Sequence, residues 1–375
     1  MGMRSLFGTK TSQPWIIFSV LSTTRLSGKN TAQGFPSYKI SFASTGASAT
    51  GKRATSNRMA LPPELIDVDC NLLHGDLKTL QKTADASFSP WNMLEEDAVK
   101  SANVVGMVSP SSTMEESERG IELLSTHPPP LAIKTTVGIH PYHVRDESLL
   151  ATPLEEHAVR LKNLLAANRD VCAAVGECGL DASDGFPPLE DQIPWFRRQI
   201  EIAQELGLPL FVHERLAFDT AMDMLECVDP LQTPVIIHCF TGTQAECNAY
   251  IERGYFVSVS GYILKPSNDN CAEVVSCLEE GVIPLDKLMI ETDAPYMGFE
   301  GCRQLYLEFN QSYMASLNSK KRKRLKQSIY PNVPSSLPMV LSKVTECLQK
   351  KDPTLTREKV AKATTANARN FFGLP

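Results

Sequence analysis

The sequence contains no long hydrophobic run and no regular cysteine pattern. The longest apolar stretch near its start spans only Trp15 to Leu21, far short of the roughly 20 residues that cross a bilayer. A membrane span is therefore not expected. The 10 cysteines of the 375-residue chain are scattered without a CxxC pair, which disfavours a disulfide framework or a zinc finger. We expect reduced thiols in an intracellular compartment.

Acidic residues are missing from the start of the chain, where Glu64 is the first. Eight basic residues precede it, and the other 29 basic residues follow it. All 43 acidic residues, Glu64 included, lie in the chain from Glu64 onward. A basic, Ser/Thr-rich stretch without acids is typical of an organellar transit peptide. We expect residues 1–60 to be such a leader, cleaved before Leu61, which would direct the protein to a mitochondrion or a plastid. A disordered tail on a cytoplasmic or nuclear protein is the alternative. A secretory signal fits less well because the basic stretch continues past a short apolar core.

Short apolar runs typical of buried strands alternate with segments of helical spacing from Leu65 onward. The eight candidate strands are Leu65–Asp69, Asn103–Val108, Ile133–Ile139, Cys172–Gly176, Pro209–Val212, Pro234–Ile237, Tyr255–Val259 and Lys287–Ile290. The candidate helices include Leu154–Ala167, Ile193–Leu206, Thr243–Arg253 and Ala272–Glu280, with Gly207 and Gly254 where helix C-caps belong. Eight strand–helix repeats predict an α/β fold, a closed (β/α)8 TIM barrel over residues 61–375. Length alone would also allow two average domains.

Four side chains that bind metals lie at, or just past, the ends of predicted strands. They are Glu177, His213, His238 and Asp293. A single histidine after a strand is usually structural, but four such residues in equivalent positions favour a shared site. The carboxyl ends of parallel strands meet at one end of a barrel, so we expect these four side chains to converge there. Without thiolates at these strand ends, a structural zinc site is disfavoured.

The first predicted strand adds two oxygen-bearing side chains to this set. Asp69 and Asn71 are two residues apart, so on an extended chain they point to the same face. Carboxylates and imidazoles together suit Mg²⁺, Mn²⁺ or Zn²⁺. The sequence therefore predicts one or two divalent metal ions, held by Glu177, His213, His238, Asp293, Asp69 and Asn71.

Six motifs occur in a characteristic order along the chain: TVGIHP (136–141), VGECGLD (175–181), FVHER (211–215), IHCFTG (237–242), IETDAPY (290–296) and TANARNFFG (365–373). In this order they resemble the TatD-like metal-dependent deoxyribonucleases, a branch of the amidohydrolase superfamily. The resemblance covers about Leu65 to Leu374. It implies a barrel with one or two divalent cations that hydrolyses phosphodiester bonds, often as a 3′→5′ exonuclease on DNA.

The chain departs from the family pattern in a few places. Asp69-Cys70-Asn71 stands where many members have His-x-His, although a subgroup with Gly-x-Asn is similar at Asn71. Val333 occupies the acidic position of an Asn-Glu-Pro triplet, and Leu216 replaces an aspartate after Arg215. We expect a weaker hold on the first metal and another hydrogen-bond acceptor for Arg215.

Three residues are expected to carry the chemistry. Glu177 would bridge the cations, which would lower the pKa of a water molecule. Asp293 would take the proton of that water and hand it to the departing 3′-oxygen. His140, like its neighbour His143, follows the third strand and would contact the phosphate or stabilise the leaving oxygen. The remaining histidines, His74, His127 and His157, are expected to be surface or structural residues.

Substrate binding should require positive charge because the rest of the chain is acidic. The segment from Met297 to Tyr330 follows the eighth strand and should emerge on the catalytic face. Its basic residues would clamp a nucleic-acid backbone while Tyr306 and Phe309 stack on bases. A solvated helix or a localisation signal are the alternatives. The predicted substrate-binding residues are His143, Arg215, Arg303, Lys320, Lys321, Arg322, Lys323 and Arg324.

The expected substrate is DNA, with RNA as an alternative, and neither a membrane nor a specific protein partner is predicted. Two other functions share the barrel. A small-molecule amidohydrolase or lactonase would have the metals but would not need the basic segment. A catalytically impaired binding module would explain the changes at Asp69 and Val333, but the four ligand-type residues Glu177, His213, His238 and Asp293 argue against it.

Overall fold

The computed structural model describes residues 62–78, 94, 97–226 and 233–375. The predicted leader, residues 1–60, lies outside this part of the chain. Within it, no helix combines the length and the apolar composition that crossing a membrane requires.

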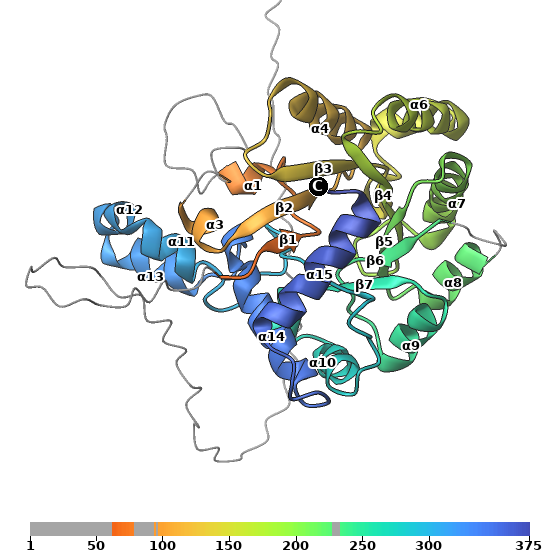
Figure 1. The fold of residues 1–375 in the computed structure, drawn as a ribbon. Coiled ribbons are helices and arrows are strands. Elements are labelled where there is room, and N and C mark those ends of the chain that lie inside the picture. Colours follow the sequence, from red (N-terminus) through yellow and green to blue (C-terminus); the bar gives the residue numbers. More distant parts are fainter. Residues whose placement is uncertain (1–61, 79–93, 95–96, 227–232) are drawn as a thin grey trace, which may run out of the picture. The chain divides into compact units, whose positions relative to one another are not determined.

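Eight parallel strands form one sheet in which every strand pairs with the next one along the chain. The edges β1 and β8 also meet, because Val68 N donates to Ile290 O at 3.3 Å and Cys70 forms a parallel bridge with Ala294. Helices surround this sheet, so the predicted (β/α)8 barrel is confirmed (Figure 1). The strands are β1 (Leu65–Asp67), β2 (Val104–Ser109), β3 (Ala132–Val137), β4 (Cys172–Asp181), β5 (Leu210–Arg215), β6 (Val235–Ile237), β7 (Phe256–Val259) and β8 (Leu288–Ile290).

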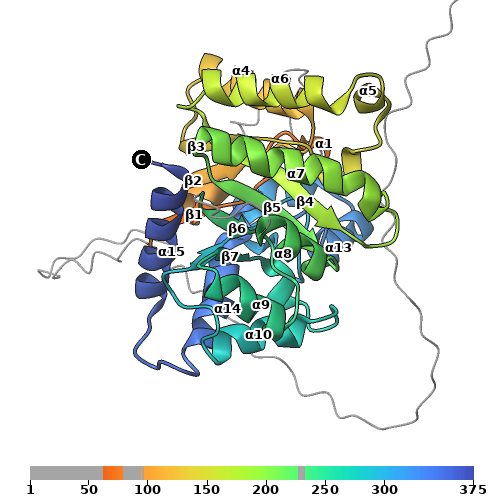
Figure 2. The same ribbon diagram turned by 90° about the vertical axis from the view of Figure 1, so that its right-hand side faces the viewer.

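The helices form an outer layer around the strands, as a view from the side shows (Figure 2). The four helices predicted from the sequence are present as α6, α7, α9 and α10. The described helices are α1 (Gly75–Lys78), α3 (Asp97–Ser101), α4 (Met114–Thr126), α5 (Glu147–Leu150), α6 (Leu154–Ala167), α7 (Leu189–Leu206), α8 (Phe218–Glu226), α9 (Gln244–Glu252), α10 (Cys271–Glu279), α11 (Gln304–Phe309), α12 (Gln311–Ser316), α13 (Ser319–Gln327), α14 (Leu337–Leu348) and α15 (Arg357–Phe372), with 3-10 turns η1 (Pro141–His143), η2 (Gly261–Leu264) and η3 (Pro334–Ser336).

Local sequence explains where several of these helices begin and end. Thr243 caps α9 with a reciprocal capping box to Glu246, which satisfies two of the free N–H groups of the first turn. Gly207 ends α7 in the left-handed conformation at φ 60°, which costs a glycine little because it has no Cβ. Helix α7 begins at Leu189, earlier than predicted, directly after Pro188.

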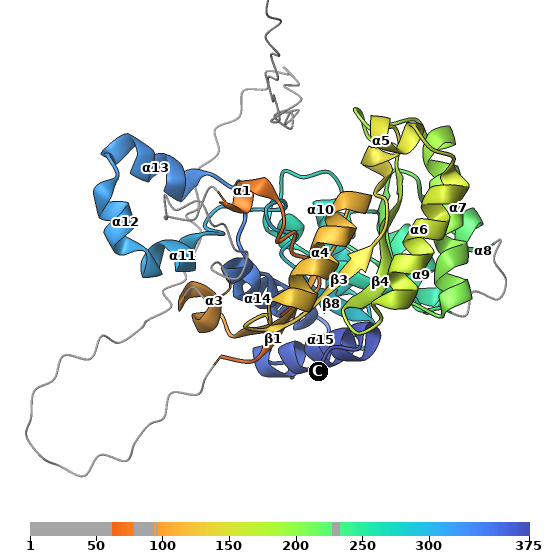
Figure 3. The ribbon, with the colours of Figure 1, turned by 90° about the horizontal axis from the view of Figure 1, so that it is seen from above.

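The inside of the barrel is apolar and is closed at one end by the C-terminal helix. Phe371 and Phe372 of α15 belong to the same buried cluster as Ile66, Phe211 and Met289 of the strands. This apolar cluster fills the barrel interior, so polar side chains that could bind a metal can gather only at the end of the barrel opposite α15. Figure 3 shows α15 at the end of the barrel that lies away from α1 and α13.

The longest strand, β4, contains a bulge that aims a side chain at the barrel mouth. The register of its pairing with β5 shifts between Val175 and Cys178. Gly176 and Glu177 are therefore the residues at which the regular pairing is interrupted. Gly176 and Gly179 have φ of 143° and 145°, where a Cβ is strained. A Cβ at Gly179 would also lie 1.8 Å from the His213 carbonyl oxygen. Glycine therefore permits the close approach of the two strands.

The close packing at Gly179 can be tested by Gly179→Ala. We expect the free energy of unfolding to fall by at least about 2 kcal/mol, because the methyl group meets a backbone oxygen and the backbone conformation is strained. Urea denaturation measures the difference at constant m value. Gly75→Ala is the matched control, since no atom lies within 4 Å of the added Cβ. Equal stability of the two variants would contradict the interpretation.

Candidate metal centre

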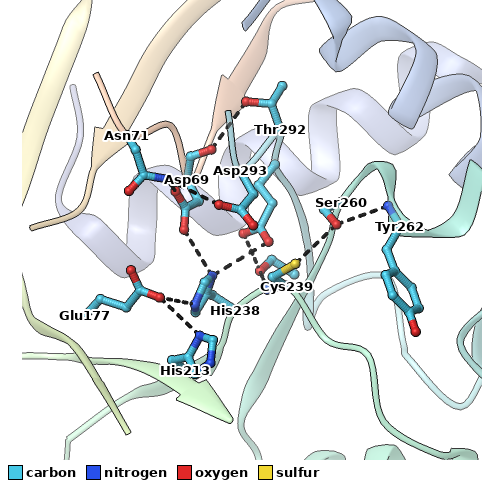
Figure 4. Close-up of polar contacts among 12 residues, drawn as sticks. Asp69, Asn71, Glu177, His213, His238, Cys239, Ser260, Tyr262, Thr292 and Asp293 are labelled. Atoms are coloured by element: carbon cyan, nitrogen blue, oxygen red, sulfur yellow. Dashed lines mark hydrogen bonds and ion pairs between the residues drawn. The ribbon is translucent and has the colours of Figure 1, made fainter. Parts of the chain in front are cut away.

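The predicted ligand residues converge at the carboxyl end of the barrel (Figure 4). Glu177 and His213 lie within β4 and β5, and His238 directly follows β6. Asp69 and Asp293 follow β1 and β8, and their segments are joined by a hydrogen bond of 2.8 Å from Asp293 N to Asp69 O. This backbone link between the first and last strands holds the two carboxylates at the same level of the barrel.

The side chains form two groups that share one carboxylate. In the first, Glu177 Oε1 lies 3.3 Å from His140 Nε2 and 3.2 Å from His213 Nδ1. In the second, Glu177 Oε1 lies 2.8 Å from His238 Nε2, and His238 Nδ1 lies 3.0 Å from Asp69 Oδ2. Within each group the ligand atoms are all within 4.8 Å of one another. Glu177 thus occupies the place of a carboxylate that bridges two ions.

Several of these buried polar atoms lack a hydrogen bond of normal geometry within the described residues. They are Asp69 Oδ2, both ring nitrogens of His238 and Glu291 Oε1. Such atoms are costly unless they find a partner. Asp69 Oδ2 and Glu291 Oε1 lie 3.0 Å and 3.9 Å from His238 Nδ1, while His238 Nε2 faces Glu177. Imidazole nitrogens and carboxylate oxygens at this spacing fit a divalent cation. The donor set therefore suits a metal, and it contains no thiolate.

Burial and mutual repulsion shift the pKa values of the carboxyl groups. Burial raises the pKa of Asp69 well above its ordinary value, and the neighbouring Asp293 raises it further. Burial likewise raises the pKa of Asp293 to about 8, against the effect of His238. Glu177 behaves in the opposite way: burial would raise its pKa, but His140 and His238 hold it well below the usual range. The site accumulates more buried acid than its histidines offset, which a bound cation would relieve.

The histidines are shifted in different directions. Burial lowers the pKa of His140 to about 4. Burial would also lower the pKa of His213, but a hydrogen bond to Asp181 raises it to about 9. His238 lies between Glu177 and Asp69, which raise its pKa well above the ordinary value although burial opposes them. A metal ion would replace the protons that hold these imidazoles and carboxylates together.

A second layer of polar side chains orients the ligand residues. Asp181 Oδ2 lies 2.8 Å from His213 Nε2, and the other oxygen, Oδ1, accepts a hydrogen bond of 2.7 Å from the backbone N–H of Ser183. Glu291 accepts a hydrogen bond of 2.6 Å from Ser258 and lies 3.9 Å from His238 Nδ1. Partners of this kind set the ring orientation of metal-binding histidines. Sequence reasoning did not assign Asp181 or Glu291 a role, although both lie in the motifs that carry the ligands.

Asn71 lies among these carboxylates. Its Nδ2 donates to Asp69 Oδ1 and to Asp293 Oδ1, both at 3.2 Å. In this arrangement Asn71 fixes the separation of the two acids, and its predicted role as an oxygen ligand stays a prediction.

His140 and His143 lie on the same side of the mouth but differ in surroundings. His140 Nδ1 accepts a hydrogen bond of 3.2 Å from Tyr142 N, which turns Nε2 toward Glu177. This places His140 in a ligand group, a position that the sequence prediction of a phosphate contact did not include. His143 is half-buried, and its Nδ1 lies 2.8 Å from Asp146 Oδ2. Its predicted contact with substrate stays a prediction.

Arg303 was predicted to bind substrate, and the structure contradicts this. The side chain is only 2% exposed. Its guanidinium donates to three backbone carbonyls, at 2.8 Å to Pro331 and Leu325 and at 2.5 Å to Ser328. Arg303 therefore ties the end of α13 to the start of α11. The prediction that Tyr306 stacks on a base is wrong for the same reason, because Tyr306 is buried at 3% exposure.

The other predicted cations remain accessible. Lys320, Lys321, Arg322, Lys323 and Arg324 are all exposed on α13, which contains no buried residue.

Arg215 ends β5 and is half-buried. Burial lowers the pKa of Lys265, and the charge of Arg215 lowers it further. Lys265 follows β7 and η2, and the strand-end rule that found the ligands could have found it.

The chain matches the family described as TatD related DNase over residues 67–373. This chain belongs to that family. Two similar curated proteins are named "3'-5' ssDNA/RNA exonuclease TatD". The one from Erwinia tasmaniensis is 32% identical over 198 residues, 53% of this chain and 71% of that protein. The one from Escherichia coli is 33% identical over 196 residues, 52% of this chain and 70% of that protein.

Solved structures of TatD proteins share the fold. A hydrolase TatD family protein from Entamoeba histolytica aligns with a TM-score of 0.63 at 20% identity, covering 84% of this chain and 99% of that one. The TatD homolog YJJV from Escherichia coli aligns with a TM-score of 0.61 at 22% identity, covering 83% and 98%. With the family match, these findings identify a metal-dependent hydrolase.

The departure from the TatD pattern at Val333 has a structural counterpart. Val333 is 2% exposed and packs with Ala98 and Tyr306 in a small apolar cluster. An acid at this position would be buried in apolar surroundings, which is costly without a partner. Val333 packs this segment against Ala98 of α3, whereas Arg303 holds the segment together by hydrogen bonds within it.

From the two groups of ligand residues we expect divalent cations to stabilise the folded protein. Thermal unfolding of the metal-free protein with added Mn²⁺ should show a rise in Tm, since saturation at 100 times Kd contributes about 2.7 kcal/mol. Glu177→Gln, which keeps the size but removes the shared anion, should lose most of this rise. Glu118→Gln on the exposed face of α4 is the control and should keep it. The same rise in all three proteins would show that the ion binds elsewhere.

Proposed function

We propose that this TatD-family protein is a divalent-metal-dependent exonuclease that removes nucleotides from the 3′ end of DNA. The observation that supports the proposal is the pair of ligand groups that share Glu177 at the mouth of a TatD barrel. The names of the similar curated proteins agree with such an activity. RNA is the alternative substrate.

The residues present suit two ions. His140 and His213 with Glu177 would hold one, and Asp69 and His238 with Glu177 the other. When bound, Mg²⁺, Mn²⁺ or Zn²⁺ there would offset charge on the scissile phosphate and lower the pKa of a water molecule.

Asp293 is the residue placed to move the proton. It lies at the mouth in the left-handed conformation, at φ 51°, and Asn71 fixes one of its oxygens. As general base, Asp293 accepts the proton of the attacking water. As general acid, it returns a proton to the 3′-oxygen that departs. The negative charge of Glu177, which stays ionised because His140 and His238 lower its pKa, keeps the ligand set ready for a cation.

The remaining mouth residues supply positive charge or hydrogen bonds for the phosphate. Asp146 orients the ring of His143 through the contact at 2.8 Å to Nδ1; the other ring nitrogen donates to a phosphate when the imidazole is protonated. Arg215, at the end of β5, and Lys265 supply two further positive charges that act on each other. Two like charges side by side favour a bound anion between them. A lactone or cyclic amide would make no use of this charge, which is why the nuclease is preferred over a small-molecule amidohydrolase.

The role of Asp293 can be tested by Asp293→Asn. Loss of the proton-transfer group should reduce cleavage of end-labelled DNA by about 100-fold or more. Asp286→Asn, an exposed acid before β8, is the control and should cleave like the wild type. Digestion is followed on 3′- and 5′-labelled single and double strands with each of the three cations, and on RNA. Hydrolysis of lactones but not of oligonucleotides would refute the nuclease proposal.

We further propose that residues 1–60 direct the protein to a mitochondrion or plastid, on the strength of their basic, acid-free composition. A fluorescent protein fused behind residues 1–60 should collect in one of these organelles. A fusion in which the basic residues of this stretch are replaced by glutamine should not. A diffuse cytosolic signal from the first fusion would refute the proposal.

A further inference from the structure

Two tyrosines lie between the metal centre and the basic helix α13. Tyr296 comes three residues after Asp293, and its backbone N–H donates to Asp293 O at 2.6 Å. Tyr330 comes three residues after the last residue of α13. The two rings are 6.3 Å apart between centroids and inclined at 42°. The contact between the rings thus links the turn after Asp293 to the loop that follows α13.

Both rings are held in place by neighbours from the segment after β1. The Tyr330 hydroxyl is hydrogen-bonded to the carboxylate of Asp76 in α1. The ring of His74 meets Tyr296 edge to face, with centroids 5.3 Å apart and planes at 73°. Tyr296 and Tyr330 are nevertheless only half-buried. A pair that served the core alone would be covered more completely, as Tyr306 is at 3% exposure.

The electrostatics beside the tyrosines favour a polyanion. Helix α13 carries six basic residues and no acid, whereas the whole chain has a net charge of −6. The buried guanidinium of Arg303 fixes the end of this helix through Leu325 O and Ser328 O. Arg322 and Lys326 also line a hollow of about 570 Å³ against α11 and α12. Positive charge is therefore concentrated on one fixed helix, and Tyr330 follows its end by three residues.

We propose that Tyr296 and Tyr330 form a nucleobase-stacking subsite for single-stranded nucleic acid. The strand's phosphates lie along α13, its bases stack on the two tyrosines, and its 3′ end reaches the metal centre beside Asp293. Stacking on aromatic rings tolerates any base and requires unpaired ones, so the subsite selects single strands over duplexes. This inference rests on the proposed nuclease function and names the substrate class.

The subsite can be tested by binding alone, with the full chain in EDTA, where the metal needed for cleavage is absent. Fluorescence anisotropy gives the Kd of a labelled 12-nucleotide single strand. Tyr330→Ala should raise this Kd by roughly 5- to 100-fold, as expected for the loss of one stacked base. Tyr330→Phe, which keeps the ring, and Ile329→Ala, an exposed apolar neighbour at 40% exposure, should stay within about threefold of the wild type. An unchanged Kd for Tyr330→Ala would overturn the proposal, as would no binding by the wild type.

An oligonucleotide with abasic positions separates stacking from charge. It keeps every phosphate but lacks the rings, so the wild type should bind it at least about fivefold more weakly than the intact strand. Tyr330→Ala, which keeps Tyr296, should show a smaller difference between the two strands than the wild type does. Replacement of Lys320, Lys321, Arg322 and Lys323 by glutamine should instead flatten the salt dependence of Kd. An equal abasic penalty in wild type and Tyr330→Ala would overturn the stacking subsite.

The proposed nuclease function and this subsite fail in different ways. A wild type that binds the single strand but cleaves no DNA with any divalent cation refutes the nuclease function. A wild type that cleaves DNA while Tyr330→Ala binds and cleaves equally well refutes only the subsite.

Discussion

A single buried carboxylate, that of Glu177, organises the mouth of this barrel. Three imidazoles, from His140, His213 and His238, lie within 3.3 Å of its Oε1. An ionised acid is expensive to bury unless it is paired, so its negative charge and these three rings depend on one another. The same charge makes the site a receptor for cations, and Asp69, Asp293 and Glu291 add to it. Metal binding is thus the natural way for this cluster to satisfy its own electrostatics.

The backbone around Glu177 is built to keep this carboxylate at the mouth. The glycines before and after it allow β4 to bulge against β5 at distances that no Cβ would permit. At the other end of the barrel, Phe371 and Phe372 fill the interior and exclude polar groups. The polar end and the apolar end of the barrel are consequently separated along its axis. Catalytic side chains can then vary at the mouth while the core retains the fold.

The segment between β8 and α14 adds a surface that the barrel by itself does not provide. Arg303 holds this segment together by hydrogen bonds to carbonyls within it, and Val333 packs against Ala98 of α3. This frees the basic residues of α13 to face solvent. An acidic protein that acts on a polyanion needs such a local reversal of charge. The tilted contact between the rings of Tyr296 and Tyr330 links that surface to the turn after Asp293.

The sequence alone determined the barrel and predicted most of the side chains that gather at its mouth, because strand periodicity is a local signal that repeats eight times and strand-end chemistry recurs at several of these strands. It also showed Glu177, His213, His238 and Asp293 as one group. It did not distinguish Arg303, which is buried, from the exposed cations of α13, since the sequence does not tell whether an arginine side chain will be buried or exposed. Only the tertiary structure decided that His140 joins a ligand group and that Tyr296 meets Tyr330. Such contacts join residues far apart in the chain, and their distances depend on how the strands and loops pack.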